Sequence, residues 1–268
     1  MFRGAPFKHY TYIIHLAVGD FSGGLEHRAS TVIAVPDSTN LRLAELATHE
    51  NFHSWNVKQI RPKALGPFDY TKQVRTANLR FAEGVTDYYA YLMMYRSGER
   101  DSAWLLQEFG QQIADLQNGA TRKSLTLEEC SKQTWEHGGF GVDDLSYYTK
   151  GLVVGFIFDA AIRDATGGQR SLDDVLRLLY SRHRLPNPGY DEDALREAIN
   201  EVAGTDLSSL YNRMVRSTDE LPYEVLQKIG LKLSAPGSNG RLLRGYRLER
   251  DPAAAPEAVR LRNAWLAR

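Results

Sequence analysis

The chain has 268 residues with 33 basic and 33 acidic side chains, so its formal net charge is +0, and 43% of its residues are hydrophobic. This composition is that of an ordinary globular protein, and it excludes collagen-like, disordered and disulfide-rich classes because Cys130 is the only cysteine. The balanced charge offers no basic surface for nucleic acid or anionic lipid. No apolar run approaches the roughly 20 residues that span a bilayer, so we expect a soluble chain.

The first part of the chain is predicted to contain a small β-sheet followed by a helix. Residues 9–18 and 27–36 are rich in β-branched and aromatic side chains, which is typical of strands. Asp37 and Ser38 close this β region, and the apolar spacing then becomes helical from Asn40 to about residue 56.

The remainder of the chain is predicted to be mainly helical. Residues 61–76 carry Pro and Gly at intervals that predict a loop. The predicted helices, each bounded by Gly, Pro, Asn or Asp, cover residues 79–96, 102–116, 147–165, 171–182, 192–202 and 207–215. Strands early in the chain and helices later indicate an α+β domain.

A metal-binding pattern lies on the first predicted helix. His49, Glu50 and His53 form an H-E-x-x-H sequence. Residues i and i+4 of a helix share one face, so both imidazoles can bind one zinc ion. Glu50 can then reach a water molecule bound to that zinc ion. The alternative is a surface helix with scattered polar residues. The apolar side chains on the opposite face of this helix favour the zinc site.

A catalytic zinc ion takes three protein ligands and keeps one position open. Glu83, on the next predicted helix, is the candidate for the third ligand. Asp87 lies one turn further on and could accept a hydrogen bond from the free ring nitrogen of a liganding histidine. A solvent-facing carboxylate at Asp87 is an equally weighted alternative.

Other reactive residue types are not predicted to belong to the site. The remaining histidines considered have no partner at ligand spacing; they are His9, His15, His137 and His183. Cys130 follows Glu128 and Glu129, which would raise the pKa of its thiol, so a nucleophilic cysteine is not expected.

Three separated motifs make the sequence resemble the glycyl aminopeptidase family of zinc metallopeptidases, relatives of thermolysin and aminopeptidase N. These motifs are HENFHSWN, the loop LGPFDY and the block AEGVT, in the order that the family has them. Arg80 stands where the family usually has a tryptophan, which leaves the ligand set intact. The resemblance implies a thermolysin-like fold with a small N-terminal β-sheet lobe followed by a mainly helical lobe.

The same resemblance implies a division of the chain near residue 230. Residues 1–230 are expected to be a catalytic domain without the β domain that precedes it in the family. Residues 231–268 are rich in Gly, Pro, Ala and Arg, and are expected to be a tail or the incomplete start of a PDZ-like domain.

The resemblance also implies roles for residues outside the zinc motif. In GGLEH, Glu26 matches the family's glutamate that holds the free α-amine of the substrate, and Gly23 and Gly24 let substrate backbone approach closely. Taken alone, GGLEH is more typical of a hairpin turn with an exposed acid. In SYYTKG, Tyr148 matches the tyrosine that donates a hydrogen bond to the oxyanion, and Tyr147 is the alternative.

The expected function is therefore a zinc-dependent aminopeptidase acting on peptides, with one Zn²⁺ ion and Glu50 as general base. Preference for N-terminal Gly or Ala is implied by the family alone. Two alternatives stay open: a zinc endopeptidase with the same site, and a truncated, inactive domain that binds peptides. No nucleic-acid partner is expected. Bacterial members of the family are often exported, but the sequence leaves the compartment and the oligomeric state open.

Overall fold

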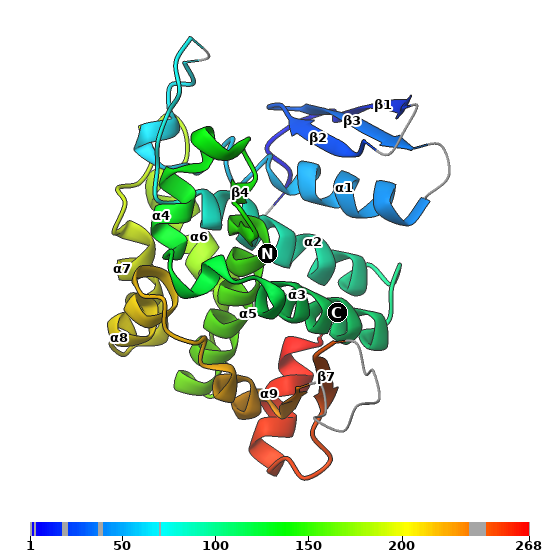
Figure 1. Ribbon diagram of the computed structural model, residues 1–268, viewed down its shortest axis with the longest axis vertical. Helices are drawn as coiled ribbons and strands as arrows, with labels where there is room; N and C mark the ends of the chain where they lie inside the picture. The colour runs from blue at the N-terminus through cyan, green and yellow to red at the C-terminus, as the bar shows by residue number, and fades with distance from the viewer. Residues whose placement is uncertain are drawn as a thin grey trace.

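The computed structural model describes residues 2, 4–17, 21–36, 40–69, 71–235 and 245–267 (Figure 1). Its first lobe is a three-stranded sheet in the order β1-β3-β2, in which β1 runs parallel and β2 antiparallel to β3. The strands are β1 (Thr11–Ala17), β2 (Gly23–Glu26) and β3 (Ser30–Pro36). Alternate residues of β3 are buried where the sheet packs on helix α1 (Asn40–Phe52), as period-2 alternation requires.

The sheet contains one more strand than the local residue pattern predicted. Residues 23–26 form β2 because their backbone pairs with β3, with Gly23 opposite Ala34 and Gly24 opposite Ile33. Local sequence alone favours a turn for a Gly-Gly pair, and the tertiary pairing overrides it. Val18 and the break predicted at residues 37–38 lie outside the described residues.

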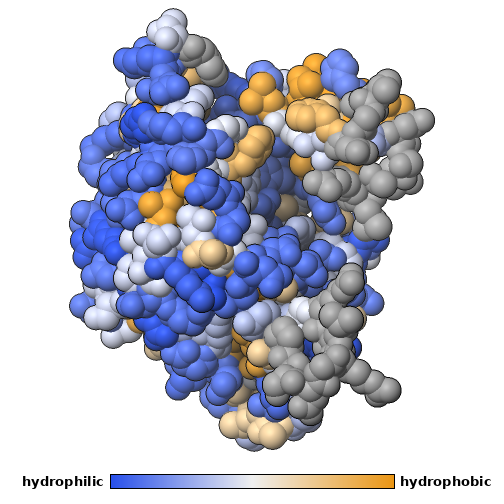
Figure 2. All heavy atoms as spheres, in the orientation of Figure 1, coloured by the Kyte–Doolittle hydropathy of each residue, from blue (hydrophilic) through white to orange (hydrophobic). Residues whose placement is uncertain are grey.

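The other edge strand carries exposed apolar side chains. On β1, Ile13 and Ile14 are 45% and 46% exposed and Leu16 is 65% exposed. Figure 2 shows this apolar surface over the sheet lobe, where the rest of the visible face is mainly hydrophilic.

The second lobe is mainly helical, as predicted. Its α-helices are α2 (Val85–Arg96), α3 (Ser102–Asn118), α4 (Leu127–Lys132), α5 (Tyr147–Ala165), α6 (Leu172–His183), α7 (Ala194–Ala203), α8 (Ser208–Tyr211) and α9 (Pro256–Trp265). Two π-helices, η2 (Arg80–Gly84) and η5 (Asn212–Arg216), precede α2 and follow α8. The 3₁₀ turns are η1 (Lys63–Leu65), η3 (Thr121–Lys123), η4 (Thr134–His137) and η6 (Tyr223–Ile229). Two short hairpins pair β4 (Gly141–Val142) with β5 (Leu145–Ser146), and β6 (Leu231–Ser234) with β7 (Arg247–Arg250).

Three helices differ from the predictions, and one of them is α9, because no helix was predicted within residues 231–268. The first helix ends at Phe52 rather than near residue 56, because Asn56 turns inward and its side-chain amide donates to the backbone carbonyl of Phe81. Helix α4 was not predicted, although Thr126 and Glu129 form a capping box at its start. A helix of six residues is too short for a period of 3.6 to stand out.

Helix α5 forms the centre of the core, and it carries an Asp159–Arg163 ion pair at 3.2 Å. Asp159 also accepts a hydrogen bond from the Tyr88 hydroxyl, which in turn accepts one from the indole of Trp265. Trp265 is fully buried at the end of α9. The described residues beyond 230 therefore pack into the same core, while the boundary expected at residue 230 stays a prediction.

The α+β fold class is confirmed, with the sheet and α1 on one side and the helical lobe on the other (Figure 1). Within the described part of the chain, no helix is both long enough and apolar enough to cross a membrane.

Candidate metal centre

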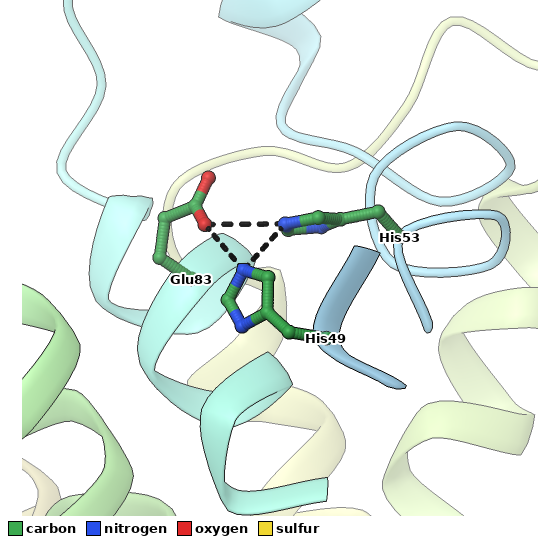
Figure 3. A group of neighbouring side chains, drawn as sticks. All are labelled: His49, His53 and Glu83. Atoms are coloured by element: carbon green, nitrogen blue, oxygen red, sulfur yellow. Dashed lines mark hydrogen bonds and ion pairs between the residues drawn. The ribbon is translucent and has the colours of Figure 1, made fainter. Parts of the chain in front are cut away.

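The last turn of α1 and the π-helix η2 bring three candidate ligands together (Figure 3). The Nε2 atoms of His49 and His53 lie 2.9 Å apart, and Oε2 of Glu83 lies 3.3 Å from the first and 3.2 Å from the second. Both histidines are buried, with exposures of 7% and 1%. The three predicted ligands thus converge on one point from two elements.

The position of η2 depends on a close backbone approach. A Cβ added to Gly84 would lie 2.5 Å from the Cα of Gly151 on α5, and one added to Gly151 would lie 2.4 Å from the carbonyl oxygen of Arg80. Only glycine fits at such a contact. This approach places Glu83 of η2 close to the first turn of α5.

The outer nitrogen of each histidine ring is occupied by an acceptor. Nδ1 of His49 donates to Oδ1 of Asp87 at 2.6 Å, and Nδ1 of His53 donates to the carbonyl of Asn56 at 2.7 Å. In neutral rings, Nε2 then carries a lone pair. Two lone pairs and the carboxylate of Glu83 consequently face one another, which is an arrangement that needs a cation.

The spacing of these atoms fits a zinc ion. Ligand atoms at about 2.0–2.2 Å from a tetrahedral zinc lie about 3.3–3.6 Å from one another. The observed separations of 2.9, 3.2 and 3.3 Å are at or slightly below the lower end of this range. The donor set of two imidazoles and one carboxylate is also one that zinc accepts at catalytic sites.

The surrounding carboxylates favour the protonated form of both histidines. Burial lowers the pKa of His49, but the charges of Asp87 and Glu83 outweigh burial and raise this pKa well above its ordinary value. The pKa of His53 is likewise raised, because the carboxylate of Glu83 outweighs its burial. Metal binding must therefore release protons from this cluster.

Glu50 lies beside the three candidate ligands and is 4% exposed. Burial raises the pKa of its carboxyl to about 7, although the two nearby histidines lower it. Its Oε2 atom is buried and has no hydrogen-bond partner among the described residues. A carboxyl group with a pKa near neutrality and an unsatisfied oxygen is suited to accepting a proton from a water molecule.

Strand β2 forms the facing wall of the site. Ligand atoms of Glu26, Glu50 and His53 lie within 4.8 Å of one another. A Cβ on Gly24 would lie 2.1 Å from Oε1 of Glu50, so the glycine allows the strand to approach the carboxylate. Gly23 lines the same cleft. The predicted GGLEH segment is therefore brought to the site, on an edge strand.

A residue that the sequence analysis did not single out also belongs to this wall. The ammonium of Lys58 forms an ion pair with Oε1 of Glu26 at 3.0 Å. Glu26 and Lys58 are far apart in sequence, so no local pattern marks the pair. Its position is visible only once the sheet is packed on α1.

The two tyrosines at the start of α5 have different environments. The Tyr147 hydroxyl donates to the carbonyl of Gly139, and the residue is 3% exposed. Both tyrosines line the cleft, and the ring centroid of Tyr148 is 6.1 Å from that of His49. Burial raises the pKa of Tyr148, and the charge of Glu83 adds to this effect, so its hydroxyl stays protonated and able to donate.

All the candidate residues line one cleft of about 1170 Å³. A cavity of this size is larger than a typical small-molecule pocket and leaves room for a peptide. Further aromatic side chains also line it; they are Phe21, Phe68, Tyr91, Trp135 and Phe140.

The residues not expected in the site stay outside it. Within the described residues, the two groups that could hold a metal contain only Glu26, His49, Glu50, His53 and Glu83. Burial raises the pKa of Cys130 to about 11, and its thiol donates to a backbone carbonyl. The direction agrees with the sequence-based expectation, but the cause is burial rather than the adjacent glutamates.

Comparisons with known proteins agree with this geometry. Residues 42–154 match the family model of the M61 glycyl aminopeptidases, a segment that includes the three candidate ligands and Tyr148 but not Glu26. The chain is also similar to the crystal structure of an aminopeptidase N family protein from Idiomarina loihiensis, with a TM-score of 0.77 and 26% identity. This match covers 88% of the present chain and 43% of that chain. No curated protein matches the sequence. The resemblance to the glycyl aminopeptidase family is thereby confirmed, and both matches support a peptidase function.

Proposed function

We propose that this chain, which is similar to the M61 glycyl aminopeptidases over residues 42–154, is a zinc-dependent aminopeptidase. The observation that carries the proposal is the convergence of His49, His53 and Glu83 on one point, with Glu50 beside them. The three would hold one zinc ion. Zinc in such a site lowers the pKa of a bound water and polarises the carbonyl of a substrate.

The chain's own residues would perform the remaining steps. Glu50 takes a proton from the attacking water and delivers it to the departing amine, and its raised pKa suits both transfers. Tyr148 donates a hydrogen bond to the carbonyl oxygen as negative charge develops on it. Asp87 holds the ring of His49 in the tautomer that presents Nε2 to the metal.

Glu26 would bind the free α-amine of the substrate. The carboxylates of Glu26 and Glu50 offer oxygens within 4.8 Å of each other. Because Glu50 would act at the peptide bond that is cut, an amine bound to Glu26 would belong to the residue just before that bond. An ammonium held there forms a charge-assisted hydrogen bond and fixes cleavage to the first peptide bond. Gly23 and Gly24 allow the substrate backbone to lie against β2. The preference for Gly or Ala at the first position is carried by family resemblance alone.

One observation favours the alternative of a zinc endopeptidase. The carboxylate of Glu26 already has a cationic partner in Lys58, so an additional amine is not required to neutralise it. The family resemblance also supports three further proposals. They are a catalytic domain that ends near residue 230, a PDZ-like domain after it, and export from a bacterial cell.

The test is release of 4-nitroaniline from glycyl-4-nitroanilide and from its N-acetylated analogue, with and without chelator and added zinc. The proposal predicts that the free-amine substrate alone is cleaved, and that chelation or Glu50→Ala abolishes cleavage. Equal cleavage of both substrates would establish an endopeptidase. Bound zinc without cleavage of either substrate would favour a domain that binds peptides without turnover.

A further inference from the structure

We propose that Lys58 is a positioning residue that holds the Glu26 carboxylate in place to bind the substrate amine. This inference rests on the proposed aminopeptidase function. Lys58 lies five residues after His53, and its backbone N–H donates to the His53 carbonyl at 2.9 Å. Its ammonium reaches β2 and forms the 3.0 Å ion pair with Oε1 of Glu26. The pair therefore connects the segment after α1 to the facing wall of the cleft.

The ion pair is shielded from water. The side chains of Lys58 and Glu26 are 11% and 19% exposed. The ammonium also lies 4.5 Å from the ring centroid of Phe68, which forms part of the cleft. The guanidinium of Arg61 lies 5.3 Å from the same ring. Phe68 is itself 37% exposed, so the cation–π contact adds a modest preference for one position of Lys58.

Electrostatics explain why Glu26 needs this partner. Glu26 and Glu50 offer carboxylate oxygens within 4.8 Å of each other. Two carboxylates this close repel when both are ionised. The positive charge of Lys58 offsets this repulsion and fixes the direction in which Glu26 points. Without Lys58, we expect the carboxylate to turn away from Glu50 and from the position of the substrate amine.

The pair also leaves room for a second cation. The ion pair involves Oε1 of Glu26, and a carboxylate has about four lone-pair sites over its two oxygens. The remaining sites can accept the α-ammonium of a substrate while Lys58 stays bound. Lys58 therefore orients the amine-binding group without touching the reacting atoms.

The experiment compares two probes that differ only in the amine. Glycine hydroxamate and acetohydroxamate share a metal-binding hydroxamate, and only the first carries an amine. Their dissociation constants are measured by calorimetry on the zinc-loaded chain. One charge-assisted hydrogen bond predicts that the wild type prefers glycine hydroxamate by about 10-fold or more. Lys58→Met is expected to reduce this preference to about 2-fold or less, and Lys58→Arg to retain most of it.

Two further variants make the comparison specific. Lys63→Met removes a different ion pair, with Asp191, from the same stretch of chain, and it should leave the preference unchanged. Phe68→Leu removes the cation–π contact while leaving Lys58 and Glu26 intact, and it should lower the preference by about 3-fold. This variant tests the inference even if Lys58→Met does not fold. Zinc content and thermal melting of each variant are measured alongside.

The outcomes separate this inference from the proposed function. A wild type that binds neither hydroxamate, or binds no zinc, would overturn the zinc peptidase and the inference together. A wild type that binds both equally would remove the amine anchor. A wild-type preference that Lys58→Met leaves unchanged or increases would overturn the role of Lys58 alone; an increase would mean that Lys58 competes with the substrate amine.

Discussion

The backbone of Gly24 lies directly against the carboxylate of Glu50: a Cβ on Gly24 would be 2.1 Å from Oε1 and 2.4 Å from Cδ. This contact joins β2 to α1 at the proposed general base. No side chain larger than hydrogen fits there unless Glu50 or the strand moves.

Replacing Gly24 with alanine should therefore impair catalysis more than folding. We expect kcat with glycyl-4-nitroanilide to fall about 10-fold to 100-fold, because the displaced carboxylate no longer meets the attacking water. The comparison is Gly23→Ala, whose added Cβ would meet only Phe21 at 3.5 Å and not Glu50, so this variant is expected to raise KM and to leave kcat nearly unchanged. An equal kcat for the two variants would contradict a catalytic position for Glu50 beside β2.

Replacing each of the two adjacent tyrosines with phenylalanine should affect different properties, namely kcat for Tyr148 and melting temperature for Tyr147. Tyr148→Phe is expected to lower kcat by about 100-fold with little change in melting temperature, because it removes a donor to the developing oxyanion. Tyr147→Phe is expected to lower the melting temperature and leave kcat within about 3-fold, since it loses a buried hydrogen bond to Gly139. The reverse pattern would assign the oxyanion role to Tyr147.

Asp87→Asn should weaken zinc binding. The amide cannot match the carboxylate that orients His49, so affinity for zinc is expected to fall by about 10-fold to 100-fold. Competition with a fluorescent zinc chelator measures the change. Asp173→Asn on α6, whose carboxylate accepts a hydrogen bond from Tyr89, serves as a control away from the metal ligands. Unchanged zinc affinity in Asp87→Asn would show that Asp87 acts only as a charged surface group.

Lys150 provides a prediction about stability and pH. Burial lowers its pKa from 10.5 to about 8. The unfolded chain therefore binds more protons between about pH 8 and 10.5, and the contribution of Lys150 to stability rises with pH across that window. Methionine does not carry the buried charge that destabilises the folded wild type. The free energy of unfolding of Lys150→Met should therefore be higher than that of the wild type by up to about 3 kcal/mol at pH 7, and by less at pH 9.5.

Urea denaturation at the two pH values measures this difference. Lys132→Met serves as the control, because the Lys132 side chain is 49% exposed and pairs with Glu128 on the surface. A difference between wild type and Lys150→Met that stays constant with pH would show that Lys150 keeps its ordinary pKa in the folded chain.

Sequence predicted the part of the site that depends on local spacing. His49 and His53 share a helix face because they are four residues apart, and this follows from helix geometry alone. Glu83 was found as an acid on the next helix, but the π-helical backbone that carries it was not predictable from a period of 3.6. Sequence left Tyr147 and Tyr148 as alternatives, and it could not show that the Tyr147 hydroxyl donates to Gly139, because that contact depends on tertiary packing.

The unpredicted parts are contacts between distant segments. Residues 23–26 form a strand because β3 pairs with them, and a local reading of two glycines favours a turn. Lys58 forms an ion pair with Glu26 of β2, and neither residue is distinguished within its own segment. Both contacts depend on how the sheet packs on α1. The periodicity of the sequence does not predict this packing.

The most direct test of the zinc site is anomalous diffraction at the zinc absorption edge from crystals grown with one equivalent of zinc. We expect one strong peak about 2.0–2.2 Å from Nε2 of His49, Nε2 of His53 and a carboxylate oxygen of Glu83. A peak at another position, or no peak at a zinc concentration that saturates the solution protein, would contradict it.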